Sequence, residues 1–399
     1  MLKAHAPALT VLLGALVASG PLAMDIYLAS MPTMVQALGA THEQVQSTLS
    51  TYMLGWGIAQ LLAGPVSDRF GRRPALVVGL VLFASASAAC ALAQSVETLI
   101  AARFVQALAL APVAVVPRAM VRDMHAGDHA AHVLSLMGVV LGVAPIVAPI
   151  IGSYLHAWFG WQASFVFVAA YGAVLLVLVV TQLPETIRRR DPAAMNARAM
   201  AANYAKLLRS RRYLRYLLVA TFSTCGLFAF LGGSAFVFVS VLGHSEQGFG
   251  FLFAMVMLGN ISGAVIGSRW VRRVGLDRMI FRSSWLMLAA GLTMGVLAWS
   301  GVVHPAAIVV PMFLFMVAFM TTMPQATAGA LTPFPDIAGS ASSLLAFCQF
   351  TGGSVSAFAV GFAYDGTTRP MTTVIAIASV LTFAAFRLLA GGKAPASDD

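Results

Sequence analysis

Charged side chains are scarce in this 399-residue chain. Asp, Glu, Lys and Arg make up 10% of it, whereas hydrophobic residues make up 59%, and the mean hydropathy is +0.86. A soluble domain carries about 25% charged residues, so the charges here are too few to cover a water-exposed surface. The composition therefore excludes a soluble globular protein and predicts an all-α integral membrane protein with room for about a dozen helices of about 20 residues.

Groups for covalent or metal chemistry are also few. The three cysteines, Cys90, Cys225 and Cys348, fall far apart inside apolar segments without metal-ligand or redox spacing, and we interpret them as small buried hydrophobic residues. No acid pair, His/Cys cluster or nucleotide-binding loop has a catalytic spacing. We therefore expect no enzyme activity, no cofactor and no metal, and an ion gradient as the energy source.

Twelve apolar runs have lengths near one bilayer thickness. They lie at 8–31, 44–66, 74–94, 97–119, 131–156, 161–183, 213–242, 247–270, 279–300, 304–330, 338–363 and 371–390. We divide the chain into a six-helix bundle (1–183), a linker (184–212) and a second six-helix bundle (213–399). Within the linker, 192–212 is compatible either with an amphipathic helix lying on the membrane or with a solvated segment held near it by charge.

Basic residues gather in the loops on one side of these runs. They are Arg69, Arg72, Arg73, Arg118, Arg122 and those within 188–215 and 269–282, whereas the opposite loops hold only Arg369. The asymmetry predicts that both termini are cytoplasmic. The net charge of +10 then reflects topology and contact with anionic membrane lipid, and we expect no nucleic-acid partner.

The two halves contain a weak internal repeat. "GPVSDRFGRRP" follows the second run and "GSRWVRRVGLDR" follows the eighth, with Gly71 aligned on Gly275 and Arg272 replacing Asp68. Two parallel six-helix halves of this kind predict a transporter with a central site at their interface.

The stretch "GPVSDRFGRRPAL" (64–76) resembles the loop motif between spans two and three of the major facilitator superfamily. Its glycines permit tight turns, its acid can accept hydrogen bonds from a helix N-terminus, and Pro74 suits the start of a helix. The resemblance implies a cytoplasmic latch in which Asp68, Arg72 and Asp123 press against the start of span eleven and steady the outward-facing state. The latch residues are Gly64, Asp68, Arg69, Gly71, Arg72, Arg73 and Asp123.

Further motifs narrow the resemblance. "RFVQALALA" resembles the intramembrane arginine motif of the family, and "GVVLGVAPIVAPIIG" the span-five motif of proton-coupled exporters. "MDIYLASMP", "RAMVRD" and "PDIAGSASS" resemble the bicyclomycin and chloramphenicol resistance (Bcr/CflA) branch of drug:proton antiporters. The exporter-motif residues are Gly138, Gly142, Pro145, Pro149 and Gly152; the glycines allow close helix approach, and the prolines serve either gating or packing.

Two ionisable residues lie deep within the runs. Asp25 is the only one of Asp, Glu, Lys, Arg and His between Ala8 and Met31, where a charge costs about 2.5–3.5 kcal/mol, and it is the only carboxylate well inside any span. We predict that Asp25 carries the coupled proton and is functionally linked to Arg103. The alternatives are a permanently ionised Asp25 that pairs with neighbouring helices, and an Arg103 that is merely solvated by carbonyls and Gln106.

Other polar and aromatic residues are candidates for lining a substrate cavity. Tyr52, Trp56 and Gln60 share one helix face, although packing explains such a stripe equally well. The candidates are Tyr27, Tyr52, Trp56, Gln60, Gln106, Asn260, Gln325 and Gln349. The resemblance implies a monomeric antiporter in a bacterial cytoplasmic membrane that exchanges protons for small, largely apolar antimicrobials. The alternative is a proton-coupled symporter that imports a small metabolite.

Overall fold

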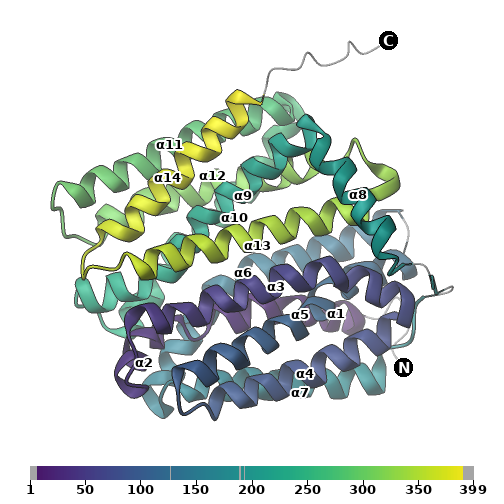
Figure 1. The fold of residues 1–399 in the computed structure, drawn as a ribbon, viewed down its shortest axis with the longest axis horizontal. Coiled ribbons are helices and arrows are strands. Elements are labelled where there is room, and N and C mark those ends of the chain that lie inside the picture. Colours follow the sequence, from purple (N-terminus) through teal and green to yellow (C-terminus); the bar gives the residue numbers. More distant parts are fainter. Residues whose placement is uncertain (1–6, 126, 188–189, 193, 390–399) are drawn as a thin grey trace.

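The computed structural model describes residues 7–125, 127–187, 190–192 and 194–389, and within them every regular element is helical (Figure 1). The elements of the first half are α1 (Pro7–Asp25), η1 (Leu28–Ser30), α2 (Met31–Ala37), α3 (His42–Phe70), α4 (Arg72–Ala91), α5 (Val96–Met124), α6 (Gly127–Phe159) and α7 (Gln162–Gln182). After α8 (Ala197–Arg209), the second half contains α9 (Arg211–Ala235), η2 (Phe236–Val241), α10 (Glu246–Val274), α11 (Leu276–Trp299), α12 (Ala306–Leu331), η3 (Pro335–Ile337), α13 (Ala338–Phe362) and α14 (Arg369–Leu388).

The predicted twelve-span, all-α architecture is confirmed. Eleven helical segments of the described residues are long and apolar enough to cross a membrane. The twelfth span, α3, has 29 residues and is about 44 Å long at 1.5 Å per residue, but it is more polar than the others. Its polarity follows from its position, because α3 lies between α5 and α13 and directs Gln46 and Ser50 towards protein rather than lipid.

Successive spans alternate in direction, so the connections gather at two faces. We call the face with α8 and the tight turns at Gly71 and Gly275 the linker face. We call the opposite face the far face; its loops are 38–41, 92–95, 160–161, 242–245, 300–305 and 363–368. In Figure 1 the linker face lies near α8 on the right, and the far face lies near α2 on the left.

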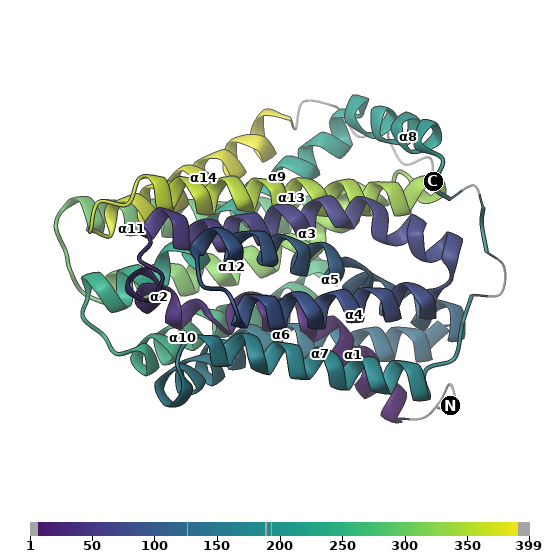
Figure 2. The same ribbon diagram turned by 60° about the horizontal axis from the view of Figure 1, so that its bottom comes forward.

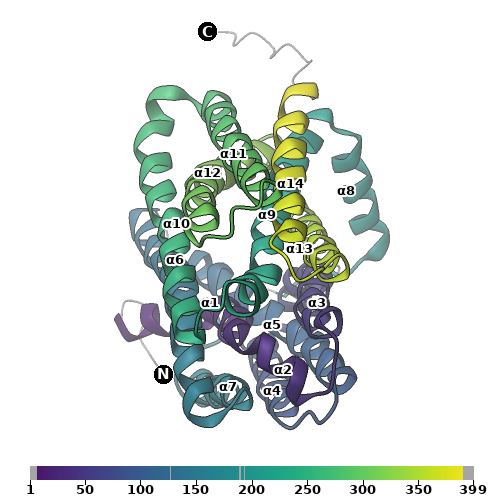
Figure 3. The ribbon, with the colours of Figure 1, turned by 90° about the vertical axis from the view of Figure 1, so that its left-hand side faces the viewer.

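The two halves pack against each other along two pairs of helices. In Figure 1 the purple and blue helices of the first half lie below the green and yellow helices of the second half, with α3 beside α13 at the boundary. Figure 3 shows the second pair, α6 beside α10. Helix α8 packs on α13 at the linker face (Figure 2), where Asn203 Nδ2 donates to Ser340 Oγ (3.3 Å).

The first span is not the continuous helix that the apolar run 8–31 predicted. α1 ends at Asp25, and the chain passes through Tyr27 and the 3-10 turn η1 before α2 continues to Ala37. Pro32 explains the break, because it has no N–H to offer and its ring crowds the carbonyl one turn earlier. Broken spans at mid-membrane are a common way for transporters to build binding sites.

Candidate functional site

The break in the first span holds Asp25 inside the protein. Its side chain is 1% exposed, and Oδ1 finds no hydrogen-bond partner among the described residues. Helix α6 crosses the break at close range, since a Cβ added to Gly152 would collide with the carbonyl oxygen of Ile26. The close approach of α6 to the break therefore helps to bury the carboxyl group, and Oδ1 is left without a bond.

Arg103 on α5 is fully buried beside this break. Its Nη1 donates to the carbonyl oxygen of Ala23 (3.0 Å) and to Gln106 Oε1 (2.6 Å). The guanidinium also lies over two aromatic rings, 3.9 Å from the centroid of Tyr52 and 4.4 Å from that of Tyr27. Charge-assisted hydrogen bonds and cation–π contacts each stabilise a buried cation by about 1–3 kcal/mol, which offsets part of its desolvation.

The residues around the guanidinium are themselves positioned by polar contacts. Gln106 Nε2 donates to Ser87 Oγ on α4 (2.7 Å), and the hydroxyl of Tyr27 shares a hydrogen bond with Thr48 Oγ1 on α3 (3.0 Å). Nε and Nη2 of Arg103 nevertheless have no hydrogen-bond partner in the described part of the chain. The guanidinium is thus held in place with unused donors.

Asp25 and Arg103 interact without forming a salt bridge. The guanidinium is near enough to act electrostatically on the carboxyl group, but no ion pair joins these two described residues. A buried carboxyl group close to a fixed positive charge, with an unsatisfied oxygen, can change protonation state without first breaking a salt bridge. The arrangement is chemically suited to binding and releasing a proton.

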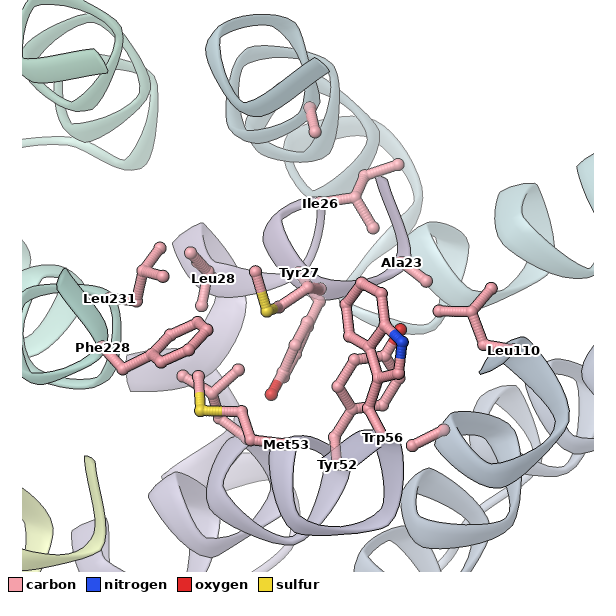
Figure 4. Close-up of a cluster of buried hydrophobic side chains, with 14 of the residues drawn as sticks. Ala23, Ile26, Tyr27, Leu28, Tyr52, Met53, Trp56, Leu110, Phe228 and Leu231 are labelled. Atoms are coloured by element: carbon pink, nitrogen blue, oxygen red, sulfur yellow. The ribbon is translucent and has the colours of Figure 1, made fainter. Parts of the chain in front are cut away.

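An aromatic wall continues from this cluster across the interface between the halves. Figure 4 shows Tyr52 and Trp56 of α3 pointing towards Tyr27, while Phe228 of α9 enters from the second half. Trp56 stacks on Phe350 of α13, with ring centroids 4.6 Å apart. The indole Nε1 of Trp56 and the hydroxyl of Tyr52 are buried and lack hydrogen-bond partners among the residues the structure covers. The wall combines flat apolar surface with free donors.

The halves are closed between this wall and the far face. Among the described residues, hydrogen bonds between them run from Gln46 Nε2 to the Ala357 carbonyl (2.9 Å), from Ser354 Oγ to the Ser50 carbonyl (2.7 Å) and from Thr33 Oγ1 to Glu246 Oε1 (2.7 Å). His156 Nε2 also lies 3.0 Å from Glu246 Oε1. Towards the linker face the packing loosens. A Cβ added to Gly64 on α3 or to Gly339 on α13 would meet nothing within 4 Å.

A second polar cluster lies at the linker face of the first half. Arg72 bonds to Asp68 (2.5 Å), Asp123 (3.1 Å) and Ser67 Oγ (2.6 Å), so three of the predicted latch residues, Asp68, Arg72 and Asp123, come together. The start of α13 takes no part in the bonds of Arg72, and a Cβ on Gly339 would meet nothing within 4 Å. The contact of this cluster with span eleven therefore stays a prediction for another conformation.

The acid that accepts from a helix N-terminus in this cluster is Glu185, not Asp68. Its carboxylate accepts from the backbone N–H groups of Arg72 (3.1 Å) and Arg73 (3.2 Å), which are free donors at the start of α4. Two features require glycine at position 71. Its φ of 108° is rarely adopted by other residues, and a Cβ there would lie 2.6 Å from Glu185 Oε2. Arg69 is exposed and lies over the ring of Phe70 (5.4 Å). The sequence signal for Glu185 was an isolated acid directly after the sixth span.

Comparison with known proteins identifies the family. The model of the Major Facilitator Superfamily matches residues 11–357. The chain belongs to the major facilitator superfamily. As a member of that superfamily it is a membrane transporter and not an enzyme.

Named relatives and a solved structure agree with this assignment. The transporter is 31% identical to the "Bicyclomycin resistance protein homolog" of Haemophilus influenzae over 94% of each chain. It is 30% identical to the "Chloramphenicol resistance protein" of Pseudomonas aeruginosa, over 82% of this chain and 77% of that one. The crystal structure of D-xylose-proton symporter shares the fold, with a TM-score of 0.71 at 15% identity, covering 95% of this chain and 98% of that chain.

The span-five motif of this transporter has two parts with different surroundings. Near the far face, α6 and α10 are tightly packed, since a Cβ on Gly250 would lie 3.4 Å from the Pro149 carbonyl oxygen. Towards the linker face, a Cβ at Gly138 or Gly142 would meet nothing within 4 Å. The close approach expected at these two glycines is wrong for this conformation, because the halves separate there. Pro145 lies within α6 between the two parts.

The structure separates the candidate cavity residues. Tyr27, Tyr52, Trp56 and Gln106 belong to the Arg103 cluster, and Gln60 lies half-buried one turn beyond Trp56 on α3. The remaining candidates lie in the second half.

Those second-half residues make other contacts. Asn260 Nδ2 donates to Met257 Sδ within α10 (3.5 Å), and Gln325 Nε2 lies 3.7 Å from the Cβ position of Gly267, in the contact of α12 with α10. Gln349 is half-buried on α13. The structured part of the chain shows no contact between these three residues and Arg103.

Polar contacts in two places could not be foreseen from the sequence. Ser87 and Thr48 orient the residues around Arg103, and both resemble ordinary span residues in the sequence. Glu246 joins the halves at the far face through Thr33 and His156. This role of Glu246 could not be inferred from its position in the first turn of α10, because acidic residues are common in the first turn of any helix.

Proposed function

We propose that this transporter is a proton-coupled antiporter that exports small, largely apolar antimicrobials across the bacterial cytoplasmic membrane. The observation that carries the proposal is the buried, unsatisfied Asp25 carboxyl at a helix break beside Arg103, next to an aromatic wall shared by both halves. The proton site and the aromatic wall are adjacent. Proton and drug can therefore favour different conformations without touching the same atoms.

The relatives support the choice of cargo. Two of them are named for resistance to bicyclomycin and to chloramphenicol. The wall of Tyr52, Trp56, Phe228 and Phe350 suits flat apolar molecules, and its unsatisfied hydroxyl and indole N–H can each donate one hydrogen bond to a bound drug. A sugar would require many more convergent polar groups than this wall offers.

We place the linker face in the cytoplasm, because arginines concentrate there and are rare at the far face. Both termini are then cytoplasmic, and the present conformation is closed to the outside. In the opposite state, the Asp68–Arg72–Asp123 cluster contacts the start of α13. We further propose that each chain works as a monomer in membrane lipid, with bundles 1–183 and 213–399 moving about the interface and 184–212 linking them.

The test is transport by purified protein in vesicles with an imposed proton gradient. Asp25→Asn preserves size but cannot titrate, so the variant should bind drug and fail to concentrate it against its gradient. Asp25→Glu is the matched control, because it keeps a titratable carboxyl, and it should retain part of the uphill transport. Uphill drug movement by Asp25→Asn would show that Asp25 is not the coupling group.

The direction of the proton gradient separates export from the alternative of import. An antiporter moves drug against the proton flow, whereas a symporter moves its substrate with it. Co-directional movement of proton and substrate through the wild-type protein would refute the antiporter proposal and support metabolite import.

A further inference from the structure

The only acidic side chain that joins the two halves directly, among the described residues, is Glu246 at the far face. Its Oε1 accepts from Thr33 Oγ1 on α2 (2.7 Å) and lies 3.0 Å from His156 Nε2 on α6. Thr33 and His156 belong to the first half and Glu246 to the second. We call these three residues the far-face cluster.

The far-face cluster is built around one carboxylate. Both contacts converge on the same oxygen of Glu246, and the carboxylate lies in the first turn of α10, where the helix N-terminus favours negative charge. The side chains of His156 and Glu246 are 11% and 17% exposed. Their burial is sufficient for the contact to stabilise the closed halves, and their exposure is sufficient for proton exchange with water at that face.

We propose that His156 is a proton-binding site that strengthens closure of the far face when the outside becomes acidic. A neutral imidazole donates an ordinary hydrogen bond from Nε2 to the carboxylate, whereas the imidazolium makes a charge-assisted bond of about twice the strength. The bond exists only while the halves are closed. By linkage, a proton that strengthens it shifts the population towards the closed state.

Among free side chains, histidine rather than glutamate changes charge over the physiological range. An unperturbed histidine changes charge near pH 6.5 and an unperturbed glutamate near pH 4.3. The Nδ1 of His156 is buried and has no hydrogen-bond partner in the part of the chain described here, so the contact of Nε2 with Glu246 is the one bond that a change of charge would strengthen. We therefore expect a moderate change in the closed-to-open ratio, about fivefold, rather than an all-or-none switch.

Few other ionisable groups face this cluster. Helix α6 packs against α1, α5, α7, α10 and η1, and α5 carries Glu97 in its first turn at the far face. Helix α2, which carries Thr33, packs against α3, and α3 carries Glu43 in its first turn at the same face. The other neighbours of α10, which are α9, η2, α11 and α12, have their charged residues near the linker face. His244 precedes α10 in the far-face loop, and Asp25 ends α1. Elsewhere at the far face, His42 lies between the rings of Phe236 (5.1 Å) and Tyr364 (4.7 Å).

The function of the far-face cluster differs from that of Asp25. A proton on His156 arrives from and returns to the far-face side, so it adds nothing to the number of protons transported. It biases which conformation the protein adopts. This inference rests on the proposed function only for the statement that the far face is the outside.

The experiment measures the conformation and not transport. Spin labels on cysteines placed at Ala37 and Val303, exposed residues at the far face on opposite halves, report the closed and open populations in a background without the native cysteines. All variants also carry Asp25→Asn, so the proposed coupling acid contributes no pH response. The protein is studied in vesicles without drug, at about pH 8 and about pH 5.5, a range that brackets histidine titration.

We expect the closed-to-open ratio of the parent to rise about fivefold on acidification. His156→Gln, which keeps a donor but cannot titrate, and Glu246→Gln should each abolish this rise. His304→Gln is the matched control and should retain the rise, because His304 is an exposed far-face histidine whose Nδ1 accepts from the Ala306 N–H within its own half. Thr33→Val should lower the ratio at both pH values but preserve the response.

Two results would overturn the proposal. One is a pH response that survives in His156→Gln, and the other is a parent protein whose far face opens rather than closes on acidification. Because no gradient or drug is used, failure here is distinguishable from failure of the vesicle transport test, in which Asp25 is the residue examined.

Discussion

Gly57 offers a direct way to force the far-face closure apart. It lies midway along α3 facing α13, where an added Cβ would lie 3.1 Å from Phe350 Cβ and 3.3 Å from the Phe347 carbonyl oxygen. The carbonyl cannot rotate away as a flexible side chain can. Gly57→Val places two further methyl groups at this point, and overpacking of this kind costs about 1–3 kcal/mol. The closed conformation should therefore lose population by roughly five- to 150-fold.

The matched control is Gly64→Val. Gly64 lies two turns along the same face of α3, and a Cβ there meets nothing within 4 Å beyond its chain neighbours. Pro65 follows it and adds a local cost for valine in the helix, which acts on both conformations because the helix is kept in both. If the halves alternate, Gly64 becomes crowded only when the linker face closes, and its variant should favour the present conformation.

The assay is the same spin-label distance between Ala37 and Val303 at the far face, measured without drug at one pH. Gly57→Val should lengthen the main distance, whereas Gly64→Val should leave it short. A shift in the same direction for both variants, or none for Gly57→Val, would refute the reasoning from packing.

Three further predictions concern the buried and linker-face charges. Arg103→Lys keeps the charge but loses the planar group that bonds to Ala23 and Gln106 at once. The export rate of this variant in vesicles should fall by about tenfold but stay above that of Arg103→Ala. Equal export rates for the two variants would contradict this prediction. Asp68→Asn alters a half-exposed ion pair with Arg72 that is worth about 0–1 kcal/mol. Transport should therefore slow a few-fold, and the equilibrium affinity for drug should not change. A weakened drug affinity would argue against the role of Asp68 in a latch. Glu185→Gln removes negative charge from the start of α4 and should lower stability by about 0.3–1 kcal/mol in thermal unfolding, whereas no change would show that the cap is neutral.

The sequence was sufficient to predict the fold and the two buried charges. Twelve apolar runs of bilayer length can form little else, and Asp25 and Arg103 stand out because charges are rare in such runs. The helix break at Tyr27 was harder to predict from the sequence, although Pro32 was a local signal for it.

Long-range partners could not be predicted in the same way. Glu185 reaches the start of α4 from the linker, and Glu246 meets Thr33 and His156 from the other half. Nothing in the local sequence of either acid distinguishes it from an ordinary loop or helix-start residue. Such contacts depend on how the helices pack, and a single sequence does not carry that information in any one segment.

Two kinds of contact close the interface between the halves at the far face, and the difference between them has a consequence for coupling. Along α3 and α13, Gln46 and Ser354 make hydrogen bonds that no change of pH in the working range alters. Along α6 and α10, closure depends on a carboxylate that is sensitive to the charge of His156. The free energy that closes the far face then has one contribution that does not depend on pH and one that the outside pH sets. This bias helps an antiporter that must turn its proton-loaded site from the outside to the inside. The low outside pH that protonates Asp25 also favours the state closed to the outside, in which the proton is carried inwards.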